Sequence, residues 1–459
     1  MRAPHRRARR ASRSRGRIAI GVVAVALLAS TTACAAGAGG KSDTGHSINV
    51  LMVNNPQMVD LQRLTADNFT AQTGITVNYT VLPENDLRDK VSQEFSSQAN
   101  QYDVASLSNF EIPIYAGNNW LYPLDDFVAG DPEFDQPDIF PSMTQSLSAD
   151  GVLYGEPFYG ESSFLMYRKD ILDAKGVVMP ERPTWQQVAD IAATVDHAEP
   201  DMRGICLRGQ PGWGQVIAPL TTVVNTFGGT WFDKDWTAQV NGPGFTEATD
   251  FYVNLVQQHG ELGAPSAGFT ECLTALAQSK VAMWYDATSA AGILEAADSP
   301  VKGKLAYAQA PVEKTASSGW LYAWSWAIEK NTQKSTDAWK FISWASGKGY
   351  ENLVGNELGW SRVPAGKRSS TYENPQYLSA AAAFAEPTKT AITEANPTDP
   401  GVQPRPTVGI QFVGIPEFTA LGTKVSQDIS SAIAGQLSVQ DALNRGQELA
   451  TKVGVTYQQ

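Results

Sequence analysis

The chain has 459 residues, of which 42% are hydrophobic and 18% charged, so it is long enough for two or three packed domains and too apolar for global disorder. Its formal net charge is -12, but the first 17 residues hold eight arginines and no acid, which leaves 27 basic and 47 acidic residues and a net charge of -20. A body this acidic repels phosphate backbones, which excludes nucleic acid as a partner.

The amino terminus has the pattern of an export signal. An arginine-rich stretch precedes the apolar segment 18–29, which is too short for a bilayer core that needs roughly 20 residues. The sequence Thr31-Thr32-Ala33-Cys34 then resembles the lipobox of bacterial lipoproteins, in which the cysteine is acylated and becomes the first residue. We expect a lipoprotein signal peptide over residues 1–33, lipid on Cys34 and a flexible tether over residues 34–46. The alternative is ordinary signal cleavage, which would leave the protein unanchored.

The remaining cysteines form an even pair if Cys34 carries lipid. Cys206 and Cys272 would then lie in an oxidising compartment, and we expect a disulfide between them. The chain has four histidines and no Cys/His cluster at ligand spacing, so the sequence indicates neither a metal site nor a cofactor.

Strand and helix patterns alternate after the tether. Residues 47–53, 75–81 and 103–107 have the apolar patterns of strands, and helical spacing of apolar residues separates them. This alternation predicts βαβ units and a mostly parallel sheet. Ligands of such sheets bind beyond the carboxyl ends of the strands, where the loops 54–55 and 108–109 are expected.

The carboxyl end is predicted to be helical. An apolar stripe runs from Phe418 to Ile433 at helical spacing, and Ser438-Val439-Gln440-Asp441 is a capping-box-like start for a second helix.

Aromatic residues alternate over a short segment, so that in a strand four rings would point to one face: Trp320, Tyr322, Trp324 and Trp326. Large rings with a polar handle suit the C–H groups and hydroxyls of a carbohydrate. The alternative is that these rings fill core between a sheet and a helix.

Asp286 is expected at the end of a strand, because it follows the apolar residues 281–285. Its carboxylate there could accept hydrogen bonds from two adjacent hydroxyls, with Arg208 donating to others and Trp324 forming an apolar wall. The alternative role for Asp286 is a helix N-cap. The acidic run 125–138 lacks the glycine and closing glutamate of an EF-hand, and we interpret it as a solvated loop.

Several stretches resemble extracellular solute-binding proteins of ABC importers, of the maltose-binding-protein type. Residues 320–329 with 335–345 are similar to the strand and helix that return to the first lobe in that family, and residues 435–443 to its closing helix. The resemblance is closest to the mannitol/sorbitol-binding branch, in the stretches 53–55, 84–88, 157–163, 204–209, 284–288, 411–412 and 415–418.

The resemblance implies an α/β, periplasmic-binding-protein-like fold: two lobes with mostly parallel sheets, a multi-strand hinge and ligand in the cleft. The boundaries it implies are 47–160 plus 325–366 for lobe 1 and 161–324 plus 367–459 for lobe 2, with crossings near 155–165, 320–328 and 362–372. The ligand-binding residues we predict are Asn55, Glu84, Glu111, Tyr159, Glu161, Arg208, Trp213, Asp286, Trp320, Trp324, Trp360 and Arg362.

The function implied is that of a monomeric lipoprotein, anchored on the extracellular face of the cell membrane, that captures a sugar alcohol or small sugar for an ABC permease. It is not expected to be an enzyme. A secreted glycosidase using Glu161 and Asp286 is one rival, although no hydrolase motif accompanies them. A receptor for oligosaccharides or cell-wall fragments is another, and a purely structural lipoprotein a third.

Overall fold

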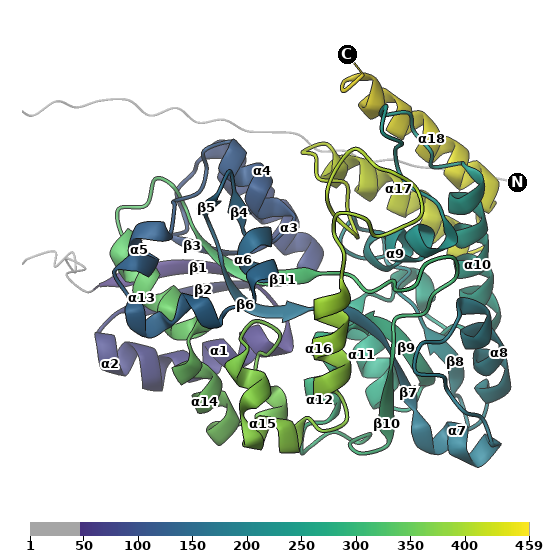
Figure 1. Ribbon diagram of the computed structural model, residues 1–459, viewed down its shortest axis with the longest axis horizontal. Coiled ribbons are helices and arrows are strands. Elements are labelled where there is room, and N and C mark those ends of the chain that lie inside the picture. Colours follow the sequence, from purple (N-terminus) through teal and green to yellow (C-terminus); the bar gives the residue numbers. More distant parts are fainter. Residues whose placement is uncertain (1–45, 459) are drawn as a thin grey trace, which may run out of the picture. The chain divides into compact units, whose positions relative to one another are not determined.

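The computed structural model describes residues 46–458, so the predictions for the signal peptide, for Cys34 and for nearly all of the tether lie outside the described residues. Within the described part, two main sheets are each covered by helices (Figure 1). No helix between residues 46 and 458 has both the length and the apolar run that a bilayer crossing requires.

The first sheet has the strand order β2-β1-β3-β11-β6. The strands β1, β2 and β3 pair in parallel, whereas β11 is antiparallel to both β3 and β6. Its strands are β1 (Ser47–Val53), β2 (Thr76–Leu82), β3 (Val104–Ser108), β6 (Glu156–Glu161) and β11 (Tyr322–Ile328). The strands predicted between residues 47 and 107 are confirmed, with boundaries shifted by at most one residue.

The second sheet has the order β10-β7-β9-β8. Only β8 and β9 pair in parallel there, so the expectation of mostly parallel sheets holds for residues 47–108 and not for the strands that follow. Those strands are β7 (Ser163–Arg168), β8 (Arg203–Cys206), β9 (Val281–Ala287) and β10 (Leu305–Gln309), and a separate hairpin joins β4 (Ser148–Ala149) to β5 (Val152–Leu153). β7 pairs antiparallel with both of its neighbours. It follows β6 of the first sheet after a single residue, whereas parallel neighbours in one sheet are normally joined by a helical crossover.

The helices before the middle of the chain mostly follow single strands. The first of them starts at Pro56, and Gly74, in the left-handed region at φ 73°, ends its continuation. They are α1 (Pro56–Thr65), α2 (Ala71–Thr73), α3 (Glu84–Ser97), α4 (Glu111–Gly117), α5 (Asp125–Ala129), α6 (Pro141–Ser146), α7 (Lys169–Lys175), α8 (Trp185–Val195) and α9 (Ile217–Phe227).

The later helices include the two predicted at the carboxyl end, which pack against each other (Figure 1). Ser438 caps the last helix by accepting a hydrogen bond from the amide of Asp441 at 3.1 Å, as its sequence predicted. They are α10 (Pro243–His259), α11 (Phe269–Ala277), α12 (Ala291–Leu294), α13 (Ser335–Ser346), α14 (Lys348–Glu357), α15 (Pro375–Ala380), α16 (Ala385–Glu394), α17 (Phe418–Ile433) and α18 (Val439–Val455).

The chain passes from the first sheet to the second between β6 and β7, and returns between β10 and β11. Beside the first passage, the amide of Gly160 donates to the carbonyl of Ala365 at 3.1 Å. A Cβ atom on Gly160 would lie 2.2 Å from the carbonyl oxygen of Gly366, and Gly366 itself has φ +82°. Only glycine at both positions allows these backbones to approach so closely.

Cys206 and Cys272 are joined in a disulfide, as predicted, with their Cα atoms 5.6 Å apart. Both are fully buried, and the bond ties the end of β8 to α11 across 66 residues of sequence.

We expect replacement of both cysteines by alanine to lower the free energy of unfolding by about 4 kcal/mol, because the unfolded chain regains the entropy of an open loop. Denaturant unfolding of the ligand-free protein, with and without the two substitutions, measures this difference. An unchanged unfolding midpoint, or two reactive thiols in unfolded and unreduced wild type, would contradict the disulfide.

Candidate ligand-binding site

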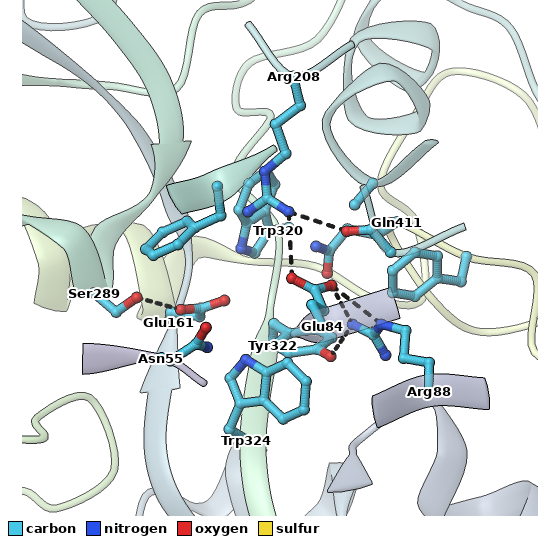
Figure 2. A pocket seen from close by; sticks show the side chains of 14 residues that line it. Asn55, Glu84, Arg88, Glu161, Arg208, Ser289, Trp320, Tyr322, Trp324 and Gln411 are labelled. Carbon is cyan, nitrogen blue, oxygen red and sulfur yellow. Dashed lines mark hydrogen bonds and ion pairs between the residues drawn. The ribbon is translucent and has the colours of Figure 1, made fainter. Parts of the chain in front are cut away.

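A pocket of about 370 Å³ lies where the ends of several strands and helices from both sheets meet (Figure 2). Its wall combines aromatic rings with charged and amide side chains. The lining residues are Asn55, Glu84, Arg88, Glu161, Arg208, Gly214, Ala218, Phe269, Ser289, Trp320, Tyr322, Trp324, Gln411 and Phe412.

Arg208 follows β8 and reaches the pocket from the second sheet. Its Nε and Nη2 atoms donate to the two carboxylate oxygens of Asp286 at 2.7 and 2.6 Å, and its Nη1 donates to the carbonyl of Gly214 at 3.0 Å. Burial lowers the pKa of Arg208, but the carboxylates of Asp286, Glu84 and Glu161 together outweigh burial and hold that pKa above its usual value. The guanidinium therefore stays charged and fixed in orientation.

Asp286 itself does not line the pocket. It is fully buried in β9, where it also accepts hydrogen bonds from the indole Nε1 of Trp284 and from the amide of Ala287. Contrary to the expectation of direct ligand contact, Asp286 is not among the residues that line the pocket, and it caps no helix, because it lies within β9. Its role is to position Arg208.

Arg88 lies one turn after Glu84 at the start of α3, so that both reach the pocket. Its Nε and Nη2 donate to a Glu84 carboxylate oxygen at 3.1 and 2.8 Å, and Nη2 also donates to the hydroxyl of Tyr322 at 2.8 Å. Trp213 lies against its guanidinium, 4.0 Å from ring centre to Cζ. Burial lowers the pKa of Arg88, but Tyr322, Glu84 and Glu111 together outweigh burial and keep that pKa above its usual value.

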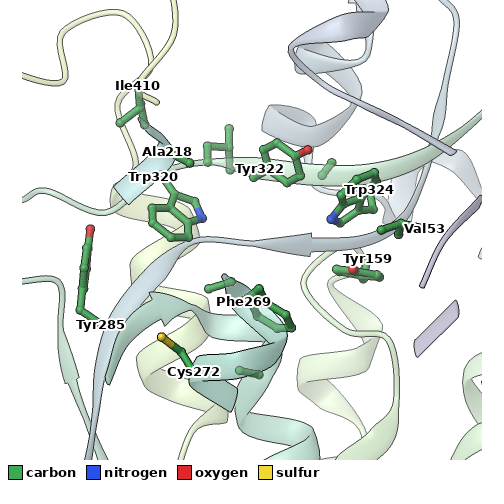
Figure 3. Packing of buried hydrophobic residues seen from close by; sticks show 14 of the residues in the cluster. Val53, Tyr159, Ala218, Phe269, Cys272, Tyr285, Trp320, Tyr322, Trp324 and Ile410 are labelled. Carbon is green, nitrogen blue, oxygen red and sulfur yellow. The ribbon is translucent and has the colours of Figure 1, made fainter. Parts of the chain in front are cut away.

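The aromatic wall comes mainly from the segment 320–324 (Figure 3). The indole nitrogens of Trp320 and Trp324 face each other across the gap between the rings. Trp326, the next residue in the alternation, is buried against Phe158 and Phe341 and does not line the pocket, as the alternative of a core role had it. β11 pairs with β3 residue by residue from Trp324 to Ile328, so Trp326 stays on the same face as Trp324 but lies two residues farther along the strand, within the core.

Glu161, the last residue of β6, lines the pocket beside Ser289 and is only 6% exposed. The Ser289 hydroxyl donates to it at 2.5 Å. Burial raises the pKa of Glu161 to about 8, against the opposing effects of the Ser289 hydrogen bond and the Arg208 charge. Asn55 lies next to it, its amide donating to the hydroxyl of Tyr159 at 2.8 Å.

Two buried donors in this wall lack a hydrogen-bond partner among the described residues: the Nη1 of Arg88 and the Nε1 of Trp320. An unsatisfied buried donor costs about 1–3 kcal/mol, which a ligand rich in hydroxyl acceptors would recover. Residues 46–458 gather no group of three acidic, histidine or cysteine side chains suited to a metal ion.

The structure brings six of the twelve predicted residues into this pocket: Asn55, Glu84, Glu161, Arg208, Trp320 and Trp324. Two more of the predicted residues contact the arginines without lining the pocket: Trp213 packs on Arg88, and Asp286 accepts hydrogen bonds from Arg208. Glu111 is a third supporting residue, since it accepts hydrogen bonds from the amide and hydroxyl of Ser108 and lies 3.7 Å from Arg88.

The other three predicted residues lie outside the pocket. Tyr159 and Arg362 line an adjoining cavity of about 380 Å³ that also reaches Ser289, and Arg362 is ion-paired there with Asp60 at 2.8 Å. Trp360 lines neither cavity and packs on Gly355, because it starts a short turn of helix after α14.

Seven lining residues were neither predicted as ligand-binding nor part of the predicted aromatic face: Arg88, Gly214, Ala218, Phe269, Ser289, Gln411 and Phe412. The Glu84/Arg88 spacing at a helix start was a usable signal for Arg88. Gln411 and Phe412 lie in an irregular segment before α17, where periodicity carries no information.

A family model described as bacterial extracellular solute-binding protein matches residues 55–352. A mannitol-binding protein of Pseudomonas aeruginosa is 37% identical over 404 residues, which cover 88% of this chain and 92% of that protein. An erythritol/L-threitol-binding protein of Mycolicibacterium smegmatis is 25% identical over 66% of this chain and 67% of its own length.

A similar solved structure is that of an ABC transporter solute-binding protein from Agrobacterium vitis with bound D-mannitol. It has a TM-score of 0.87 and 39% identity, and the match covers 90% of this chain and 99% of that one. A solute-binding protein from Agrobacterium radiobacter in complex with ribitol has a TM-score of 0.78 at 23% identity, over 89% and 99% of the two chains, which supports the fold alone.

We expect Asp286→Asn to lower ligand affinity at least about tenfold although Asp286 touches no ligand, because Arg208 loses its fixed orientation. Stability should fall as well, by about 3 kcal/mol, since a buried guanidinium loses its main partner. Titration calorimetry and thermal unfolding on the same variant measure both, with the exposed Asp250→Asn as the matched control. Full affinity at a lowered melting temperature would show that Arg208 need not be held for binding.

Proposed function

We propose that this chain, which belongs to the bacterial extracellular solute-binding protein family, captures a sugar alcohol and delivers it to the permease of an ABC importer. As a member of that family it is a binding protein and not an enzyme. The pocket does not present the carboxylate pair expected of a glycosidase, because Asp286 is buried behind Arg208, while Glu84, the other carboxylate of the lining, is ion-paired with Arg88 at 2.8 Å.

The observation that carries the proposal is the pairing of apolar rings with unpaired donors in one small pocket. The faces of Trp320 and Trp324 can cover the C–H groups of an extended polyol, and the free Nε1 of Trp320 and Nη1 of Arg88 can donate to its hydroxyls. The likeness to proteins named or shown as mannitol binders, at 37% and 39% identity, supports the same ligand class.

A longer ligand is a second candidate, favoured by an adjoining open space of about 1670 Å³ that shares Tyr322, Gln411 and Phe412 with the pocket. An oligosaccharide whose end residue occupied the pocket could extend into it. Ligand screening separates the two candidates, because the larger ligand gains affinity only if this space contributes contacts.

The protein acts, on this proposal, as a monomer held at the outer face of the cell membrane by lipid on Cys34. The support is the short apolar segment 18–29 followed directly by Thr-Ala-Cys.

We expect D-mannitol and related alditols to raise the melting temperature of the protein lacking residues 1–34. At 100 times the dissociation constant, a ligand stabilises the folded state by about 2.7 kcal/mol. Trp324→Ala should weaken binding at least about tenfold by removing one wall, while Trp236→Ala, whose ring stacks on Tyr457 away from the pocket, should leave affinity unchanged. No stabilisation by any alditol would refute the ligand class.

Cys34→Ala in the full-length chain should release the protein from the membrane fraction into the medium or the soluble fraction. The expected physical cause is loss of the acyl chains, each buried CH₂ of which contributes about 0.8 kcal/mol to membrane binding. Immunoblots of fractionated cells measure this, with Ser42→Ala in the predicted tether as a control that should stay membrane-bound. Retention of the Cys34→Ala protein on membranes would rule out the lipid anchor.

A further inference from the structure

The two arginines of the pocket are already neutralised by carboxylates of the protein. Arg208 forms its two-armed pair with Asp286, and Arg88 is paired with Glu84 at 2.8 Å and lies 3.7 Å from Glu111. Neither guanidinium therefore has charge to spare for an anionic ligand, and no lysine or histidine lines the pocket.

Glu161 is the carboxyl group of this wall that lacks a basic partner. Within residues 46–458 it forms no ion pair within 4.0 Å, and Ser289 is its hydrogen-bond donor. The charged groups that face it are Arg208, which favours its ionisation, and Asp286 and Glu84, which oppose it; the hydroxyl of Tyr159 is also close enough to interact.

The charge balance of the pocket is therefore negative, and it becomes more negative when Glu161 ionises. Four carboxylates, those of Glu84, Glu111, Glu161 and Asp286, then face two guanidinium groups. Isolated buried charge is costly, so Glu161 either keeps a proton or needs a cation beside it. A neutral polyol leaves the proton in place, an ammonium group on the ligand can replace it, and an anion would meet uncompensated negative charge.

We infer that Glu161 sets the charge selectivity of the pocket, admitting neutral and amine-bearing sugar alcohols and excluding acidic derivatives of the same carbon chain. This inference rests on the proposed function as a polyol receptor and adds a ligand class to it. When an alkylammonium ligand binds, the Glu161 carboxyl gives its proton to the buffer and the resulting carboxylate pairs with the ammonium group. Since the pKa of Glu161 is about 8 without ligand, close to one proton per ligand should be released at pH 7.

Three ligands with one six-carbon chain test this: D-sorbitol, 1-amino-1-deoxy-D-sorbitol and D-gluconate. Titration calorimetry at pH 7, in two buffers of different ionisation enthalpy, measures the affinity and the protons released. We expect the amine to bind at least about tenfold more tightly than gluconate and to release close to one proton, while sorbitol releases none.

Glu161→Gln keeps the volume of the side chain and removes its charge. We expect it to reduce the ratio of amine affinity to gluconate affinity at least about tenfold and to abolish proton release. The matched control is Glu329→Gln, because Glu329 is a 3% exposed glutamate with a pKa raised to about 7 by burial that does not line the pocket. This control should leave the ratio unchanged.

Equal affinities of wild type for the amine and for gluconate would overturn the inference, and this comparison decides even if the Glu161 variant does not fold. An unchanged ratio in a folded Glu161→Gln protein would overturn it as well. If sorbitol, mannitol and the amine all fail to bind, the polyol-receptor proposal fails, and this inference fails with it.

Discussion

The buried pair between Arg208 and Asp286 is the interaction on which the pocket depends. A guanidinium at the end of a strand has many rotamers in solution, and a buried one without a counter-charge would be strongly destabilising. Two nearly parallel hydrogen bonds of 2.6 and 2.7 Å remove both problems, since they compensate the charge and fix the plane of the group. The parallel pairing of β8 with β9 makes this possible, because it brings the two residues to the same edge of the sheet.

The same principle organises the opposite wall. Arg88 extends from α3 between Glu84 and the ring of Trp213, and Gly214 leaves room for it, since a Cβ atom there would lie 2.4 Å from the Arg88 Nε. Trp213 and Gly214 lie more than a hundred residues from Arg88 in the chain. The charged side chains of the pocket are thus held in place by a second set of side chains farther from the ligand, and aromatic rings line the remaining sides.

Two further pocket residues lie where the chain passes between the two sheets. Glu161 and Tyr322 are cross-strand partners on β6 and β11 next to the points where the chain leaves and re-enters the first sheet. The close contact of Gly160 with Gly366 lies beside them, so the backbone that carries Glu161 has little freedom to move locally. The segment that carries Glu161, whose charge we infer to set the selectivity of the pocket, is therefore also the segment by which the chain passes from the first sheet to the second.

The sequence by itself determined the features that depend on local spacing or on composition. The alternation of apolar residues located β1 to β3 and the helices between them, the apolar stripe located α17, and cysteine parity indicated the disulfide. Six of the twelve residues predicted as ligand-binding line the pocket. The tertiary structure alone decided which polar side chain faces the ligand and which stands behind it: Asp286 and Arg208 look equally suited in sequence, and only the packing of β8 on β9 places Arg208 in front. It likewise decided that Trp326 lies in the core while Trp324 lines the pocket, because the two rings share one face of β11 and only the packing of Phe158 and Phe341 covers Trp326.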